Sequence, residues 1–441
     1  MIIVVGGGVA GMATALGLRD AGKKVLVLER APHAGGKVTT VRDGDWRVEL
    51  GAMGVLDDTP ATQALLTRLG LDAQIVHASD DAKRRYLVRD GLMQAVPASP
   101  PKLLGSKLLR AGEKLRLLAE VFSRRSTVDD EPLADFLRRH VGRSLADAVV
   151  DAIPASVYAG DWTKLSTKSA FPKLWELDAK HGSLLRGMVA AERERKRAGL
   201  GRGRLMTLQG GMGTLPTTLA ATLGDDLRTG AVVDAVERKG GELGVRSDGT
   251  WLPAERVVLA VPAPDAARLV AGLDAEMTDA FGAIPMNRIA AVTLGFRRAD
   301  VRHALDGVGC LIPRAEGERL LGTLWMTSVF PVAGQAPADH VNLRSMIGGS
   351  TDPAAFDLDD QSLIEACLSS LRRHLGAGTP VFTRVDRWAE AIAQYEVGHS
   401  KLVETIESRG ERLGVYSTGA ALRGVGVNDV VREARALTAR L

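Results

Sequence analysis

The first thirty residues alternate between short apolar runs and one longer mixed stretch. Ile2 to Val5 is an unbroken apolar run of the kind found in buried parallel strands, and Val25 to Leu28 is a second such run. Between them, the residues from about Val9 predict a helix. This order of strand, helix and strand predicts the start of an α/β domain.

The pattern further along predicts a mixture of elements. Thr59-Pro60 opens a capped helix that Gly70 closes. Arg85 to Pro97 predicts a β-hairpin whose turn lies at Asp90-Gly91. Pro97 to Pro101 breaks that pattern, and about a hundred mostly helical residues follow. Strands are expected again at Val232–Val236, Leu243–Arg246 and Arg256–Val261.

The C-terminal residues predict one last helix. Asn428 is a good N-cap residue for it. Apolar side chains then recur on one helical face: Val431, Ala434, Leu437 and Leu441.

A glycine-rich turn joins the first strand to its helix. In such a turn Gly6, Gly8 and Gly11 allow a tight bend, close approach of a pyrophosphate and close helix–strand packing. The helix N-terminus would point its free N–H groups at the phosphates. Glu29 ends the second strand, where its carboxylate can accept from ribose hydroxyls. A glycine turn in an unrelated strand–helix unit is the alternative, but the complete order of elements favours a dinucleotide site.

A second glycine-rich segment, GAALRGVGVNDVV, lies near the C-terminus at Gly419 to Val431. Together with Gly35-Gly36-Lys37, which follows the first segment closely, it predicts a chain that leaves its nucleotide domain and returns to finish it. This arrangement favours FAD over NAD as the dinucleotide.

Composition fits a large enzyme of two or three domains. The net charge of +4 is small for 441 residues, and aromatic residues are only 4% of the chain, so stacking-based nucleic-acid binding is not expected. Cys310 and Cys367 lie far apart in no ligand-spaced cluster, which favours buried thiols in a reducing cytoplasm. No metal motif is present in the sequence.

Charge predicts where the chain could meet a membrane. The first basic residue is Arg19, so the apolar N-terminus lacks the basic region of a signal peptide. Lys102 to Arg125 carries seven basic and two acidic residues among leucines, and Glu192 to Arg204 carries six basic and two acidic ones. Such stretches can lie on anionic lipid; a solvated charged face with the leucines in the core is the favoured alternative. We expect a cytoplasmic protein, with peripheral contact at the inner face of the cell membrane as the further option.

The chain resembles the protoporphyrinogen oxidases of the flavin amine oxidase superfamily, a branch that includes the bacterial coproporphyrinogen oxidases. The resemblance covers essentially the whole length. It rests on the following motifs: GGGVAG with Glu29, Glu49-Leu50-Gly51, KRRYLVRDG followed by VPASPP, SVYAGD at Ser156–Asp161, LSTKSAFPKL, LQGGMGTLP from Leu208, VVLAVPA from Val257, RW followed by QY and GH up to His399, and GVGVND at Gly424–Asp429.

The resemblance implies an α/β fold with a Rossmann-like FAD-binding domain, a mixed-sheet substrate domain and a helical insert. The implied FAD domain comprises residues 1–78, 205–263 and 411–441, the substrate domain 79–98 and 264–410, and the helical domain 99–204. The implied FAD-binding residues are Gly6, Gly7, Gly8, Val9, Ala10, Gly11, Glu29, Arg30, Gly36, Lys37, Gly51, Ala52, Met53, Gly54, Val233, Trp388, Val425, Gly426 and Val427.

For the substrate, Arg85 matches an arginine that pairs with a propionate, although Lys83 and Arg84 beside it compete for that role. Leu311 and Val308 match positions in an apolar wall, and Gly160 a position where bulk would block the macrocycle. Departures from the family pattern fall at Lys37, Ala52, Val308, Ala393 and Leu422, and they concern the shape of the pocket. No protein base is identified, since a histidine such as His399 in a GH turn is more often structural.

The implied activity is the six-electron, oxygen-dependent oxidation of protoporphyrinogen IX to protoporphyrin IX in heme biosynthesis, with release of hydrogen peroxide. Oxidation of coproporphyrinogen III is the close alternative. A carotenoid desaturase, another amine oxidase, or a non-catalytic scaffold of the Rab escort type is a more distant one. The expected partners are a porphyrinogen, dioxygen and, as an option, an anionic membrane, with no nucleic acid.

Overall fold

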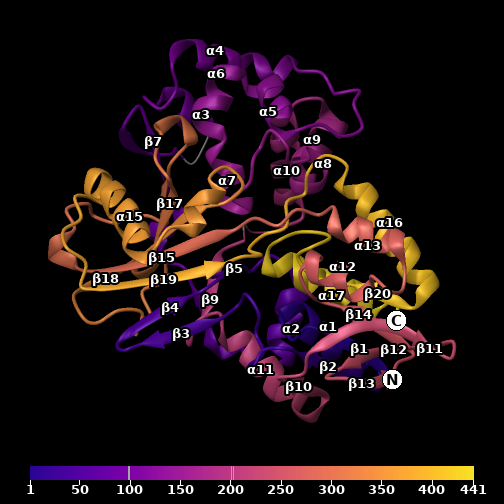
Figure 1. Cartoon of the computed structure of the whole chain (residues 1–441). Coiled ribbons are helices and arrows are strands. Elements are labelled where there is room, and N and C mark those ends of the chain that lie inside the picture. Colours follow the sequence, from indigo (N-terminus) through magenta and orange to yellow (C-terminus); the bar gives the residue numbers. More distant parts are fainter. Residues whose placement is uncertain (98–99, 200, 202, 333) are drawn as a thin grey trace. The chain divides into compact units, whose positions relative to one another are not determined.

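The computed structural model describes residues 1–97, 100–199, 201, 203–332 and 334–441. The chain folds into two compact units, each built from separated segments (Figure 1). The first unit contains residues 1–77, 203–286 and 399–441, and the second contains residues 78–202 and 287–398.

The first unit is built on a five-stranded, fully parallel sheet of order β10-β2-β1-β14-β20. β1 lies between β2, which follows it in the chain, and β14, which comes much later. The order in which strands are added to the sheet therefore reverses beside β1. Doubly wound sheets bind their ligands at such a point. The elements of this unit are β1 (Ile2–Val5), α1 (Val9–Asp20), β2 (Val25–Glu29), β3 (Thr40–Asp43), β4 (Trp46–Glu49), β5 (Val55–Leu56), α2 (Pro60–Arg68), β6 (Ile75–His77), β9 (Leu205–Leu208), α11 (Thr214–Leu223), β10 (Leu227–Thr229), β11 (Val233–Lys239), β12 (Glu242–Ser247), β13 (Thr250–Pro253), β14 (Arg256–Leu259), α12 (Ala263–Val270), α13 (Ala275–Gly282), α16 (His399–Leu413), β20 (Val415–Ser417) and α17 (Val427–Thr438).

The apolar N-terminal runs form the centre of this sheet. The four residues of β1 are at most 4% exposed, because strands β2 and β14 flank it and helices cover it. The predicted strands at both apolar runs and the helix from Val9 are therefore confirmed. The helix after Thr59 is also confirmed, as α2 ending at Arg68 with Gly70 at φ +67°.

The C-terminal helix α17 packs lengthwise against α1, so both ends of the chain complete one layer. Val431, Ala434 and Leu437 are buried on its inner face, as the pattern predicts. Our prediction of Asn428 as the N-cap is wrong, because Gly426 occupies that position. Asn428 instead accepts a hydrogen bond from Thr62 Oγ1 at 2.7 Å and donates one to the Leu56 carbonyl at 2.9 Å.

The second unit is built on a seven-stranded mixed sheet of order β19-β15-β18-β17-β16-β7-β8. The hairpin of β7 and β8 is confirmed, with Asp90 at φ +53° and Gly91 at φ +74° as a tight two-residue turn. The elements of this unit are β7 (Tyr86–Arg89), β8 (Leu92–Ala95), α3 (Pro100–Gly105), α4 (Ala111–Ala119), η3 (Glu120–Phe122), α5 (Leu133–Val141), α6 (Arg143–Leu145), η4 (Ala146–Val150), α7 (Ala152–Tyr158), α8 (Thr167–Ala170), α9 (Pro172–His181), α10 (Leu184–Arg197), β15 (Ile289–Arg297), β16 (Gly309–Leu311), η7 (Arg314–Glu316), β17 (Leu320–Trp325), α14 (Met326–Val329), β18 (His340–Gly348), α15 (Asp360–Leu375) and β19 (Phe382–Trp388).

The structure groups some segments differently from the domain boundaries expected from sequence. Residues 264–286 and 399–410 fall in the first unit, where α13 packs against α16 and α12 against β11. The helical residues 99–204 fall almost entirely in the second unit together with the mixed sheet. Residues 98 and 99 of the predicted proline break, and residues 200 and 202 of the second basic stretch, lie outside the described part of the chain. The three-domain division stays a prediction.

A buried ion pair ties the helical segment to the hairpin. Arg89 donates to both carboxylate oxygens of Glu113 at 2.8 and 2.9 Å, and both side chains are about 3% exposed. Burial raises the pKa of the Glu113 carboxyl. Hydrogen bonds from Arg89, Ser144 and the Arg110 amide outweigh that effect and lower the pKa to about 2.

We expect Glu113→Ala to destabilise the protein by about 3–5 kcal/mol, because it leaves the Arg89 charge buried without its partner. The carboxylate stabilises the fold above its unfolded pKa of 4.5, so the difference should shrink as the pH falls from 4.5 towards 2. Chemical denaturation at several pH values measures this effect. Glu194→Ala, which removes an exposed pair with Lys180, is the control; equal losses for the two variants would contradict the prediction.

Candidate cofactor and substrate sites

The turn between β1 and α1 forms an open cradle of backbone. Gly6 has φ +108°, and a Cβ there would lie 2.5 Å from the Ala260 carbonyl oxygen. A Cβ on Gly11 would lie 2.0 Å from the Gly6 carbonyl oxygen. Only glycine at this position therefore lets α1 lie so close to the turn. A Cβ on Gly8, in contrast, would meet no described atom within 4 Å. The cradle therefore leaves open space where a pyrophosphate would approach the backbone.

The N-terminus of α1 is suited to an anion. Gly8 is its N-cap, no side chain caps the helix, and its first turn contains no acidic residue. The N–H groups of Val9 and Ala10 and the positive end of the helix dipole are therefore available to a phosphate.

Glu29 closes the cradle at the end of β2. Its Oε2 accepts from the Gly7 amide at 2.6 Å and its Oε1 from the Ala31 amide at 2.8 Å. Each carboxylate oxygen keeps a further lone pair that can accept from a ribose hydroxyl. Arg30 is exposed and forms an ion pair with Asp265 at 3.1 Å. The segment before Val233 is tied to this end, because Ala231 donates to the Glu29 carbonyl at 2.9 Å.

The second glycine pair lies against the first turn. Gly35 donates to the Gly7 carbonyl at 2.9 Å, and a Cβ on Gly36 would lie 3.3 Å from the Gly8 Cα atom. Gly51 meets Lys37 so closely that a Cβ would lie 1.7 Å from the Lys37 carbonyl oxygen. Ala52, Met53 and Gly54 continue from Gly51 as a half-buried loop.

The C-terminal segment reaches the same region. Gly419, at φ +103°, would place a Cβ 3.3 Å from the Ala10 Cβ atom. Val425 to Val427 follow, and the bonds of Asn428 to Thr62 and Leu56 hold them beside the N-terminal segment. His399 is buried and bonds to the Leu422 carbonyl through Nε2 at 2.8 Å, so it supports this segment structurally. The predicted meeting of the two chain ends is thus present, and its residues fit a dinucleotide.

In the second unit, the pairing of β16 with β7 brings the predicted substrate residues together. Leu311 is in register with Leu87, and the Val308 amide donates to the Arg84 carbonyl at 2.9 Å. Arg84 is paired with Asp306, and Lys83 with Asp80 at 2.6 Å. Arg85 is exposed and has no carboxylate partner among the residues that the structure describes. Of the three neighbouring cations, Arg85 is therefore the one free to bind a carboxylate.

Gly160 and Trp388 lie near one another in the same unit. A Cβ on Gly160 would lie 2.4 Å from Gln394 Oε1 and 2.9 Å from Leu165 Cδ1. A Cβ here would therefore push against the ends of two side chains, whether or not a macrocycle binds. Sequence reasoning missed Gln394, although it stands in the QY motif. Trp388 packs with Ala159 and Ile289, so its predicted contact with FAD stays a prediction.

The cysteines and the metal-ligating residue types form no second candidate site in the described ranges. Cys310 and Cys367 are unpaired and buried, and burial raises the pKa of both thiols to about 12. Over the described ranges, no group of three or more His, Cys, Asp or Glu side chains could hold a metal ion. Neither a nucleophilic thiol nor a metal ligand set thus competes with the dinucleotide cradle.

Comparison with known proteins shows which family the chain resembles. The family model for flavin containing amine oxidoreductase matches residues 9–441. Coproporphyrinogen III oxidase of Bacillus subtilis (strain 168) is 26% identical over 456 residues, which are 99% of this chain and 96% of that protein. Chloroplastic protoporphyrinogen oxidase of Oryza sativa is 28% identical over 468 residues, 98% of this chain and 86% of that protein.

Solved structures show the same fold. A crystal structure from Exiguobacterium sp. 255-15 has a TM-score of 0.84 at 22% identity, covering 100% of this chain and 98% of that one. Reduced UDP-galactopyranose mutase has a TM-score of 0.74 at 15% identity, covering 99% and 92%. The predicted α/β, amine oxidase-type fold is confirmed. The chain belongs to the flavin-containing amine oxidoreductase family and is an FAD-dependent oxidoreductase.

Proposed function

We propose that this protein oxidises protoporphyrinogen IX to protoporphyrin IX in heme biosynthesis. The observation that carries the proposal is that Arg85, which is exposed and has no carboxylate partner among the described residues, stands two positions before Leu87, and Leu87 packs with Leu311 in an apolar cluster. A planar guanidinium can hold a propionate through two parallel hydrogen bonds, and an apolar wall suits the faces of a tetrapyrrole. The relatives named as porphyrinogen oxidases support the same substrate class.

In this proposal the chain positions the reactants. FAD, when bound, supplies a flavin ring that accepts a hydride. Arg85 anchors one propionate, while Leu311 and Val308 orient the macrocycle. The cradle around Gly8 and the N-terminus of α1 hold the pyrophosphate. Three two-electron oxidations give the porphyrin, and dioxygen takes up the electrons with release of hydrogen peroxide.

The choice between two porphyrinogens rests on the anchors at this wall. Arg84 is committed to Asp306, and Arg314 lies 3.8 Å from Asp161. Among these three described arginines only Arg85 is unpaired, and we infer that a single such anchor favours the two-propionate protoporphyrinogen IX over the four-propionate coproporphyrinogen III.

Initial rates with the two porphyrinogens under air test this choice. We expect a higher kcat/KM for protoporphyrinogen IX and three hydrogen peroxide molecules per porphyrin. A higher kcat/KM for coproporphyrinogen III would reassign the substrate, whereas turnover of neither would reject the proposed function.

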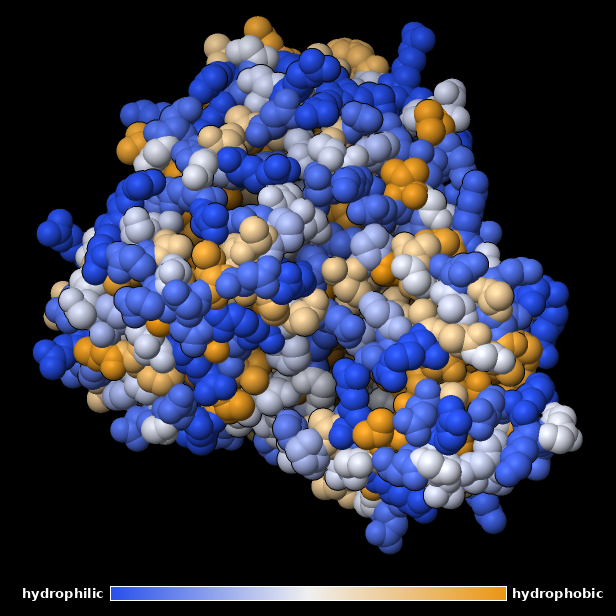
Figure 2. Space-filling view, in the orientation of Figure 1, coloured by the Kyte–Doolittle hydropathy of each residue, from blue (hydrophilic) through white to orange (hydrophobic). Residues whose placement is uncertain are grey.

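We also propose that the helical segment contacts an anionic membrane surface. Leu109 and Leu117 are buried, but Leu115, Leu118 and Phe122 on α4 and η3 are 69%, 54% and 82% exposed. Basic residues follow directly at Arg124 and Arg125. Figure 2 shows apolar residues among charged ones at its upper end, where Figure 1 places α4. Over the described residues, no helix has the length and apolar character needed to cross a bilayer.

Phe122→Ser should reduce binding to phosphatidylcholine vesicles that contain phosphatidylserine, because it removes an exposed apolar group next to two cations. Vesicle sedimentation with and without phosphatidylserine measures this binding. Val381→Ser, at a position 50% exposed in the same unit, is the control. If the wild-type protein sediments equally little with both kinds of vesicle, the basic stretch is only a solvated surface.

A further inference from the structure

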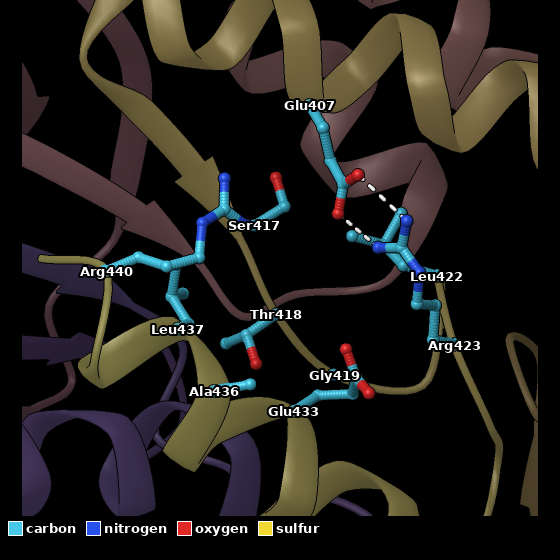
Figure 3. Close-up of a pocket in the computed structure, with 10 residues that line it drawn as sticks. All are labelled: Glu407, Ser417, Thr418, Gly419, Leu422, Arg423, Glu433, Ala436, Leu437 and Arg440. Carbon is cyan, nitrogen blue, oxygen red and sulfur yellow. Dashed lines mark hydrogen bonds and ion pairs between the residues drawn. The ribbon is translucent and has the colours of Figure 1, made fainter.

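A cavity of about 370 Å³ lies beside the edge strand β20, between α16 and α17 (Figure 3). Its lining residues come from the C-terminal part of the first unit, and none is among the residues predicted to bind FAD. They are Glu407, Ser417, Thr418, Gly419, Leu422, Arg423, Glu433, Ala436, Leu437 and Arg440. Nothing in the proposed reaction uses this cavity.

Both arginines in the wall are already committed to other carboxylates. Arg423 donates to both oxygens of Glu407, one at 2.8 Å, as Figure 3 shows. Arg440 is bonded to Glu411. The cavity therefore offers no unpaired guanidinium to an anion.

Glu433 is the carboxylate in this wall that lacks such a partner. Arg432 forms a long ion pair with it, Nε to Oε1 at 3.7 Å, and the carboxylate accepts no hydrogen bond from any residue in the described ranges. Burial raises the pKa of Glu433, and Arg423 and Arg432 offset only part of that effect. The Glu433 side chain is 26% exposed, so its oxygens are open to a ligand, and an ionised carboxylate can accept hydrogen bonds from a ligand that carries donors.

Two hydroxyls beside the cavity also lack partners. Thr418 is 4% exposed, and its Oγ1 atom has no hydrogen-bond partner in the described structure; the same is true of Ser417 Oγ. In Figure 3 the Thr418 hydroxyl lies on the side of Ala436 and Glu433. The cavity thus presents acceptors at two places, the Glu433 carboxylate and the hydroxyl oxygens.

We propose that this cavity binds a small organic ammonium ion, whose N–H groups donate to Glu433 and to the hydroxyl of Thr418. Two observations and one chemical rule support this choice. The arginines are saturated, which disfavours an anion. The unpaired polar atoms disfavour an apolar ligand. An ionised carboxylate can only accept, so its ligand must donate.

The test is calorimetric titration of the FAD-loaded protein with ethanolammonium chloride, at a mildly alkaline pH that keeps the ammonium group protonated and Glu433 ionised. We expect saturable binding of one ion per chain, and binding at least about tenfold weaker in Glu433→Gln, which keeps the shape and removes the charge. Thr418→Val should weaken binding to a smaller extent. Glu242→Gln, the same change at an exposed position of β12, should leave it unaltered.

Tetramethylammonium carries the same charge without an N–H donor, so we expect it to bind at least about tenfold more weakly to the wild-type protein. This comparison holds even if a variant fails to fold. Binding to the wild type should weaken as acid protonates Glu433. Equal binding of the two cations, equal binding by wild type and Glu433→Gln, preferential uptake of acetate, or no heat beyond dilution (a cavity filled by water alone) would each overturn the proposal. None of these readouts depends on porphyrinogen turnover.

Discussion

Replacing Gly8 by alanine is expected to leave the protein folded and to weaken FAD binding at least tenfold, which corresponds to ~1.4 kcal/mol. Gly8 has φ −76°, which any L-residue can adopt, and its Cβ would meet no described atom. The fold therefore tolerates the methyl group. The same methyl group would occupy the open side of the cradle, where the pyrophosphate must approach the backbone.

FAD titration into the flavin-free protein, together with thermal unfolding of that protein, separates affinity from stability. Gly282→Ala is the matched control, since it adds a methyl group in open space in the same unit. Gly11→Ala should lose stability as well, because its Cβ would lie 2.0 Å from the Gly6 carbonyl oxygen. Unchanged FAD affinity in the folded Gly8→Ala variant would place the pyrophosphate elsewhere.

Arg85→Ala is expected to lower kcat/KM for protoporphyrinogen IX by about 10–150-fold, because a bidentate bond between charged groups contributes about 1.5–3 kcal/mol. FAD content should not change, since Arg85 belongs to the second unit and the cradle to the first. Arg85→Lys should give an intermediate rate, because lysine keeps the charge without the planar fork. Steady-state kinetics and flavin absorbance measure both effects.

Lys83→Ala provides the control for Arg85. It removes one positive charge two positions earlier, where the side chain is 78% exposed and paired with Asp80. We expect its kcat/KM to equal that of the wild-type protein. An Arg85→Ala enzyme with unchanged KM and kcat would contradict the anchoring role, and equal losses in both variants would reduce it to a general effect of charge.

The fold could be predicted where a short stretch of sequence, such as an apolar run or a turn dipeptide, specifies its own secondary structure. β1, α1 and β2 follow from apolar runs separated by a glycine turn, and the hairpin of β7 and β8 follows from Asp90-Gly91. Asn428 shows the limit of local rules. Its amide bonds to Thr62, 366 positions earlier in the chain, so tertiary contacts override its preference for the N-cap.

The site could be predicted in part for the same reason. Gly6 and Gly11 reveal the turn, because positions where two backbone segments approach this closely accept only glycine. The freedom of Arg85 could not be predicted, since the pairing of Arg84 with Asp306 spans more than two hundred residues. The packing of Gln394 against Gly160 likewise needs the folded chain. Helical spacing alone could not separate buried Leu117 from exposed Leu115 and Leu118.

The central claim is that the two chain ends together hold one FAD that oxidises a porphyrinogen. Anaerobic addition of protoporphyrinogen IX to the purified protein, followed by visible absorbance, tests it most directly. The account predicts a yellow protein with one FAD per chain, whose flavin absorbance bleaches on addition and returns when air is admitted. A protein that stays colourless with excess FAD, or a bound flavin that the porphyrinogen does not bleach, would contradict it.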